Sequence, residues 1–229
     1  RLARLFGLSP FGEAALVACL APEWDPSFST LYGYVQDDIR RRFPTAHLLL
    51  ALFASPENVA ACHAELGDGG PLMRYRLLEA GAAESAGSPA AARPLLLAPG
   101  IAHYLLGSGH GEPRLASILR GADSGWRGTW VEEAAERVLS RAGNAARINL
   151  TGPANAAKEL IAAAVAGRMG RRLMVLDPAR LPGSETERLD LYRLLDREVR
   201  LASLACYVPP QEPESGAARL AAEAAECLE

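Results

Sequence analysis

The only lysine of the chain, Lys158, lies at a position where a phosphate-binding loop uses one. It follows Gly152-Pro153, between a short β-prone run (residues 147–151) and an Ala-rich helical stretch. In the pattern G-x-x-x-x-G-K-[ST], backbone amides around the glycines hold phosphate, the lysine contacts the outer phosphates and the hydroxyl binds magnesium. The spacing therefore predicts the strand, loop and helix of a P-loop.

Two positions of this motif depart from the pattern, because Ala157 replaces the second glycine and Glu159 replaces the hydroxyl residue. A Cβ at a glycine-only position costs about 1 kcal/mol. A carboxylate repels phosphate by about 4 kcal/mol at a separation near 4 Å and an effective dielectric near 20. We predict a degenerate nucleotide site formed by Gly152, Asn155, Ala157, Lys158 and Glu159, with no catalytic residue and no metal ligand. An ordinary strand-to-helix turn capped by Asn155 is the alternative.

The elements after the loop should form a parallel sheet. Arg171–Pro178 reads as a strand, Glu185–Arg200 as an amphipathic helix and Leu201–Val208 as a further strand. Strands alternating with helices predict right-handed β-α-β units. P-loop ATPases usually end the strand at this stage in an acidic pair that holds magnesium and polarises water, whereas Pro209-Pro210 stands here. Proline binds no metal and accepts no proton, so we expect nucleotide chemistry to have lapsed.

The segment before residue 107 is predicted to be mostly helical and to end in a hairpin. Helix starts with proline at or near the first turn occur at Ser9-Pro10, Asp25-Pro26, Pro44 and Ser55-Pro56, and the second of these helices is expected to run through Ile39. Two β-capable stretches, Leu72–Leu78 and Pro94–Leu97, and a short helix, Ile101–Leu106, follow. This is the element order of a winged helix.

The fold class is therefore an α+β winged-helix-like domain followed by a partial α/β P-loop module. We place the first domain at residues 1–107 and the degenerate module at 146–229. Residues 108–145 form a linker that contains one helix, which Thr129 begins and which ends near Arg141.

Winged helices often bind DNA, but the helix in the recognition position is unsuited to it. Residues 56–66 include Glu57 and Glu65 and no lysine or arginine, so few counterions would be released from DNA. In the one basic cluster, Arg40-Arg41-Arg42, the last two arginines lie four residues after Asp37 and Asp38, a spacing suited to local pairs on a helix. We expect protein partners or self-assembly and no nucleic acid.

Composition excludes other classes of partner. The net charge is −3, which provides no attraction towards nucleic acid or an anionic membrane. Four cysteines lack C-x-x-C spacing, which favours reduced thiols and a cytoplasmic location. No signal peptide or membrane-length apolar span is present, and a first residue of Arg1 instead of methionine indicates a fragment.

Several N-terminal runs resemble the winged-helix-variant region of bacterial AAA-family ATPases of the kind encoded with contractile injection systems. These runs are Leu5-Phe-Gly-Leu-Ser-Pro-Phe11, Cys19-Leu-Ala-Pro-Glu23, Leu31-Tyr-Gly-Tyr-Val-Gln-Asp-Asp38, Arg42-Phe-Pro-Thr45 and His103-Tyr-Leu-Leu-Gly107. The resemblance implies that a degenerate ATPase module follows this region and that an intact one lies further on. It maps the family's nucleotide loop onto Gly152–Glu159.

The resulting hypothesis is a non-catalytic adaptor and assembly region of an AAA-family ATPase. No cofactor is expected for this fragment, and ATP and magnesium belong to the full-length protein. Two alternatives stay open. One is a weak ATPase module completed by a neighbouring subunit, which rests on Gly152 and Lys158, and the other is a winged-helix DNA-binding regulator.

Overall fold

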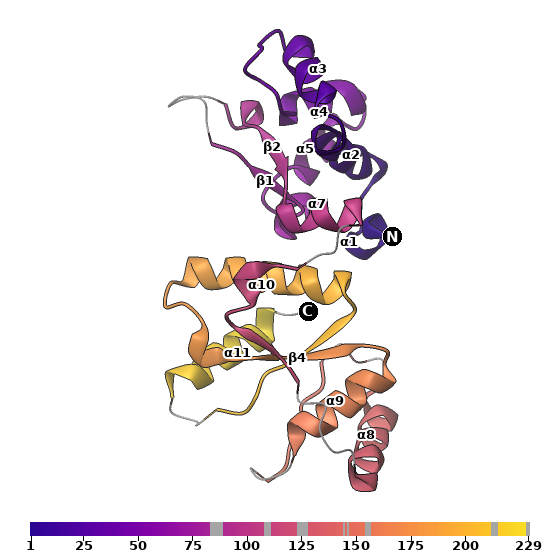
Figure 1. Cartoon of the computed structure of the whole chain (residues 1–229), viewed down its shortest axis with the longest axis vertical. Coiled ribbons are helices and arrows are strands. Elements are labelled where there is room, and N and C mark those ends of the chain that lie inside the picture. Colours follow the sequence, from indigo (N-terminus) through magenta and orange to yellow (C-terminus); the bar gives the residue numbers. More distant parts are fainter. Residues whose placement is uncertain are drawn as a thin grey trace. The chain divides into compact units, whose positions relative to one another are not determined.

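The computed structural model describes residues 1–82, 89–107, 111–122, 128–143, 145, 147–153, 157–211 and 215–227. The chain forms two compact units, Arg1–Gly111 and Glu112–Glu229 (Figure 1). No helix in these described ranges is both long enough and apolar enough to cross a membrane.

The first unit consists of helices followed by a two-stranded antiparallel sheet. Two of its helices have side-chain caps, since Ser9 accepts a hydrogen bond from the Gly12 amide at the start of α2 and Thr45 accepts one from the Leu48 amide at the start of α4. Strands β1 (Leu78–Ala80) and β2 (Leu95–Leu97) pair with Leu78 opposite Leu97. The helices are α1 (Leu2–Phe6), α2 (Pro10–Trp24), α3 (Ser27–Val35), α4 (Ala46–Phe53), α5 (Val59–Glu65), α6 (Pro71–Arg74) and α7 (Pro99–Leu106).

Apolar side chains from the helices and from both strands form the core of this unit. The most enclosed ones include Leu49 of α4, Leu72 of α6, Leu78 of β1 and Ile101 of α7, each fully buried. The strands are only three residues long, so this core holds the hairpin against the helices.

Two predicted elements of the first unit differ in the structure. The stretch Leu72–Leu78, predicted as a strand, begins with α6, because Pro71 occupies the first helical position and starts a helical turn. Helix α3 ends at Val35 and not at Ile39. Asp37, in the turn that follows the helix, adopts a left-handed φ of 52°, which ends the helical path.

The second unit is an α/β arrangement around a three-stranded sheet of order β3-β4-β5. Strands β4 (Arg172–Leu176) and β5 (Leu204–Tyr207) are parallel, with Arg172 opposite Leu204, and are connected by α10 (Glu185–Leu201). Strand β3 (Leu119–Gly121) runs antiparallel to β4. The remaining helices are α8 (Thr129–Ala142), α9 (Lys158–Arg168) and α11 (Gly216–Cys227), with short 3-10 turns η2 (Pro113–Leu115) and η3 (Pro178–Arg180).

Two apolar clusters stabilise this second unit. One surrounds Leu176 and Leu195 and joins β4 and α10 to Ala224 of α11. The other surrounds Val131 and Val165 and joins α8 to α9. Helices α9 and α10 lie on opposite sides of β4 in Figure 1, so the central strand is covered on both faces.

The strand predicted before the phosphate-binding loop is absent from the structure over residues 147–151. Ile148 packs against the cluster between α8 and α9 instead of extending the sheet. Packing against this cluster buries part of the Ile148 side chain, as a position in the sheet would otherwise do. The predicted strand is thus not formed over residues 147–151, whereas the predicted helix begins at Lys158.

Candidate functional site

The predicted phosphate loop leads into the N-terminus of α9, and Lys158 is the first residue of that helix. Gly152 adopts a φ of 152°, a backbone conformation that favours glycine. Ala157 stands at the N-cap position with no side-chain cap. Asn155, the predicted cap, lies outside the described residues. Among the residues that are described, the Lys158 ammonium makes no ion pair.

Glu159, the residue that departs most from the motif, is paired with an arginine of the sheet. Its two carboxylate oxygens accept hydrogen bonds from the two terminal nitrogens of Arg120 in β3, both at 2.7 Å. This bidentate pair fixes the first turn of α9 beside the antiparallel edge of the sheet. The Glu159 carboxylate therefore has a structural partner and points to no metal.

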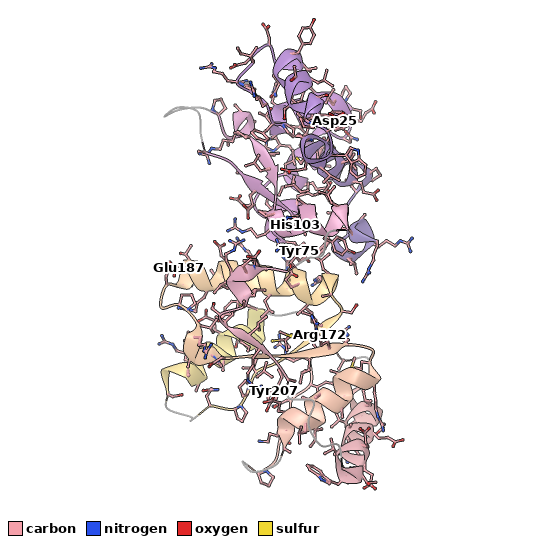
Figure 2. All side chains as sticks on the ribbon, in the orientation of Figure 1. Asp25, Tyr75, His103, Arg172, Glu187 and Tyr207 are labelled. Carbon is pink, nitrogen blue, oxygen red and sulfur yellow. The ribbon has the colours of Figure 1, made fainter. Side chains whose placement is uncertain are left out.

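The charge of the Glu159 carboxylate also affects Tyr207, the last residue of β5. Burial raises the pKa of Tyr207, and the negative charge of Glu159 raises it further. Figure 2 places Tyr207 beside α9. The phenol accordingly stays neutral and protonated near the loop, where it can donate a hydrogen bond but cannot act as a base at neutral pH.

The carboxyl end of the parallel strands offers one carboxylate close to this region, Asp177 directly after β4. Its side chain accepts a hydrogen bond from the Ala179 amide at 3.1 Å and pairs with Arg180 at 3.1 Å. These contacts cap η3 and use the carboxylate for local structure. Strand β5 is followed by Pro209-Pro210, which brings no ligand for a metal.

In the first unit, the helix in the recognition position, α5, is held by its own acidic residue. The Glu65 carboxylate accepts hydrogen bonds from both the amide and the hydroxyl of Ser9. A Cβ added at Gly12 would meet the Glu65 carboxylate oxygen at 2.1 Å, so this carboxylate sits against the start of α2. Glu65 thus joins α5 to α2 and is not directed to solvent.

The basic cluster after α3 is partly neutralised, although it lies outside any helix. Arg40 donates two side-chain hydrogen bonds to Asp38, both at 3.1 Å, and Arg41 lies 3.7 Å from the same carboxylate. These bonds lower the pKa of Asp38. Arg42 makes no ion pair within the described ranges.

A buried charge network in the second unit was not predicted from the sequence. The Arg197 side chain of α10 is fully buried and contacts Glu112 at 3.0 Å and Glu198 at 3.1 Å. Burial alone would raise the pKa of Glu112, but hydrogen bonds from Arg114 and the charges of Arg114 and Arg197 outweigh it, so that the pKa is lowered. Glu112 and Arg197 are 85 residues apart, so no local pattern indicates the pair.

Metal and thiol chemistry find no support in the described parts of the chain. No group of three or more His, Cys, Asp or Glu side chains there could hold a metal ion. The four cysteines are free, and burial raises the pKa of Cys19 and Cys206 to about 12, which keeps both as unreactive thiols.

Comparison with known proteins gives one match. A family model described as "Winged helix domain, variant" matches residues 1–119, which is more than half of the chain. No curated protein and no solved structure matches the chain. The helices and hairpin of the first unit fall within the matched region, so the predicted winged-helix element order is confirmed for this part of the chain.

Proposed function

The chain belongs to the family of variant winged helix domains, and we propose that it is a non-catalytic adaptor and assembly region. In this proposal the first unit contacts protein, and the second unit keeps the outline of a nucleotide-binding module without its chemistry. The observation that carries the proposal is the bidentate pairing of Glu159 with Arg120, where an ATPase would bind magnesium.

The chemistry of the loop supports the loss of nucleotide hydrolysis. Magnesium would need a Ser or Thr hydroxyl at position 159, and a carboxylate held by two short hydrogen bonds cannot supply it. Glu159 and Arg120 together are close to neutral, so the repulsion of phosphate is reduced but no ligand is gained. The residues at this loop do not fit magnesium-ATP.

The character of α5 supports protein contact over DNA contact. The helix has no lysine or arginine, and its one carboxylate, Glu65, is bound to Ser9. Without cations on this helix, few phosphate contacts would form and few counterions would be released. We therefore assign the exposed surface of the first unit to protein recognition.

The resemblance of the N-terminal runs to AAA-family ATPases supports a role for this region within a larger protein. We propose that ATP hydrolysis belongs to a later, intact module of the parent protein, of the kind associated with contractile injection systems. ATP and magnesium would then bind that module, and this region would recognise a partner or hold the assembly together.

Calorimetric titration with ATP and magnesium tests the nucleotide part of the proposal. We expect no heat that differs between the wild-type chain and Lys158→Ala. Micromolar binding lost in Lys158→Ala would overturn the proposal. A gain of binding in Glu159→Thr, with none in the wild type, would support the assignment of Glu159 as the residue that blocks the site.

Fluorescence anisotropy with a labelled DNA duplex at low salt tests the proposal that the first unit contacts protein and not DNA. We expect no binding by the wild-type chain. Salt-dependent binding that disappears when Arg40, Arg41 and Arg42 are all replaced by glutamine would instead favour a DNA-binding regulator.

A further inference from the structure

Helix α3 presents an uncharged and largely apolar face to solvent. None of its nine residues carries a charge. Four large side chains are exposed: Phe28 by 37%, Leu31 by 49%, Tyr34 by 83% and Val35 by 51%. A helix on the surface of a monomeric protein normally turns polar residues to water, so this face lacks a partner.

The opposite face of α3 accounts for its packing within the unit. Tyr32 is buried and donates a hydrogen bond from its hydroxyl to the Ala18 carbonyl at 2.7 Å, which fixes α3 to α2. Gly33 is buried against the backbone of Asp38 and Ile39. Because these contacts hold the helix, its exposed face is not needed for the fold of the unit.

Two further exposed apolar side chains flank the helix at its two ends. Trp24 closes α2 just before α3 and is 74% exposed. Ile39, which follows α3, is 84% exposed. Together with the four side chains of the helix they form what we call the α3 face: Trp24, Phe28, Leu31, Tyr34, Val35 and Ile39.

The two ends of the α3 face carry opposite charge. Glu23 and Asp25 lie at its start, and Asp25 accepts a hydrogen bond at 2.8 Å from the amide of Ser27, the first residue of α3. Figure 2 places Asp25 near α3, at the connection from α2. In the described residues Glu23 makes no ion pair, and the hydrogen bond from the Ser27 amide lowers the pKa of Asp25.

The far end of the face is net positive. The Gln36 side chain donates to the carbonyls of Arg41 and Phe43 at 3.2 and 3.1 Å, so the segment that carries Arg42 is pinned at the end of α3. Two aspartates, Asp37 and Asp38, face three arginines in this segment, which leaves one net positive charge. Asp38 contacts Arg40 and Arg41, and Arg42 makes no ion pair among the described residues.

We propose that the α3 face binds a second copy of this chain, with the two α3 helices antiparallel. A two-fold axis across the centre of the helix then brings Glu23 of each copy to Arg42 of the other. The apolar side chains of the two copies cover one another, and the two charge pairs at the rim fix the orientation. This inference rests on the proposed assembly function and names its partner.

Charge complementarity favours a second copy over the other occupants of an apolar helix face. A nucleic acid would need cations along the helix, and α3 has none. An anionic membrane surface would be repelled by Glu23 and Asp25. Only a partner that is acidic where this face is basic, and basic where it is acidic, matches both ends, and an antiparallel copy has that pattern.

Sedimentation velocity over a range of protein concentrations tests the dimer. We expect the wild-type chain to dimerise and Leu31→Glu to raise the dissociation constant at least tenfold, because it buries a charge in the interface. Leu105→Glu is the matched control. Leu105 is 37% exposed on α7, which lies at the other end of the first unit from α3 (Figure 1), and this variant should dimerise like the wild type. Circular dichroism checks that both variants are folded.

A charge exchange tests the antiparallel orientation without any apolar substitution. Glu23→Arg alone and Arg42→Glu alone should each weaken the dimer by about tenfold, since each creates two like-charge contacts. The double variant should return the dissociation constant to within about threefold of the wild-type value. A monomeric wild-type chain at all concentrations, or a double variant as weak as the single ones, would overturn the inference.

The outcome separates this inference from the proposed function. A monomer that neither binds ATP nor binds DNA removes the α3 dimer and leaves the adaptor function in place. A dimer whose ATP turnover depends on Lys158 removes the adaptor function and leaves the α3 dimer in place.

Discussion

Glu65 lies in the helix at the recognition position and Glu159 in the predicted phosphate loop. Each carboxylate is hydrogen-bonded to a residue of its own unit. Glu65 binds the start of α2 through Ser9, and Glu159 binds β3 through Arg120. A carboxylate that already accepts two hydrogen bonds gains little from a new ligand and loses its structural contacts if it moves. Both carboxylates therefore help to hold the fold of their own unit.

Gly12 tests the role of Glu65 in the first unit. A Cβ at this position would meet the Glu65 carboxylate oxygen at 2.1 Å, so Gly12→Ala should displace the carboxylate and break its bonds to Ser9. We expect a loss of about 1–3 kcal/mol in the free energy of unfolding, measured by urea titration. Gly69→Ala is the control, since no atom lies within 4 Å of its added Cβ, and it should change stability by less than about 0.5 kcal/mol.

Arg197 tests the buried charge network of the second unit. Its side chain is fully buried and faces the Glu112 and Glu198 carboxylates. Arg197→Leu should destabilise the unit by about 3–5 kcal/mol, because it removes the fully buried cation that the Glu112 and Glu198 carboxylates share. Arg193→Leu on the same helix removes a side chain that is 46% exposed, and urea titration should show a change below about 1 kcal/mol. Equal losses of unfolding free energy in the two variants would show that the buried network stabilises the unit no more than an exposed arginine does.

Glu112 should give this unit a measurable pH dependence. Its pKa in the folded chain is below the ordinary value of 4.5, so its stabilising contribution is complete above about pH 4.5 and is lost as the pH falls through the folded pKa. The difference in unfolding free energy between wild type and Glu112→Gln should therefore be constant from pH 6 to 7 and shrink below pH 4.5. A difference that stays constant down to pH 3 would contradict this assignment.

At the scale of elements, helices with strong local signals were predictable and contacts distant in sequence were not. The helix predicted for Glu185–Arg200 is α10, Glu185–Leu201, because its amphipathic pattern and polar start are local. Lys158 likewise begins a helix as predicted. The strand predicted before it does not form, because the Ile148 side chain packs against the apolar cluster between α8 and α9. No local sequence pattern indicates this contact. The Arg120–Glu159 pair spans 39 residues and could not be anticipated for the same reason.

Helix α11 depends on one arginine of α10. Arg188 donates to both oxygens of Glu223 at 2.8 and 3.1 Å and also to the carbonyls of Pro182 and Gly183. Arg188→Ala should speed hydrogen exchange of the α11 amides while exchange in α8 and α9 stays unchanged. Arg219→Ala, which removes an exposed arginine of α11 itself, should leave exchange in that helix near the wild-type rate. Faster exchange throughout the unit would instead indicate general destabilisation.

At the scale of the whole molecule, the chain combines a winged-helix unit with an α/β unit whose three-stranded sheet contains one parallel pair. The family match covers residues 1–119, and the second unit begins at Glu112. Both units have their own buried core, so each can carry its own function. Our account assigns protein contact to the first unit and a structural role to the second.

Release of phosphate from magnesium-ATP, measured over a range of protein concentrations, tests this account most directly. Raising the concentration favours assembly and lets neighbouring copies complete each other's sites. We predict that phosphate release by the wild-type chain equals that of Lys158→Ala at every concentration. Turnover that rises with assembly and disappears in Lys158→Ala would contradict the account and show that the chain hydrolyses ATP.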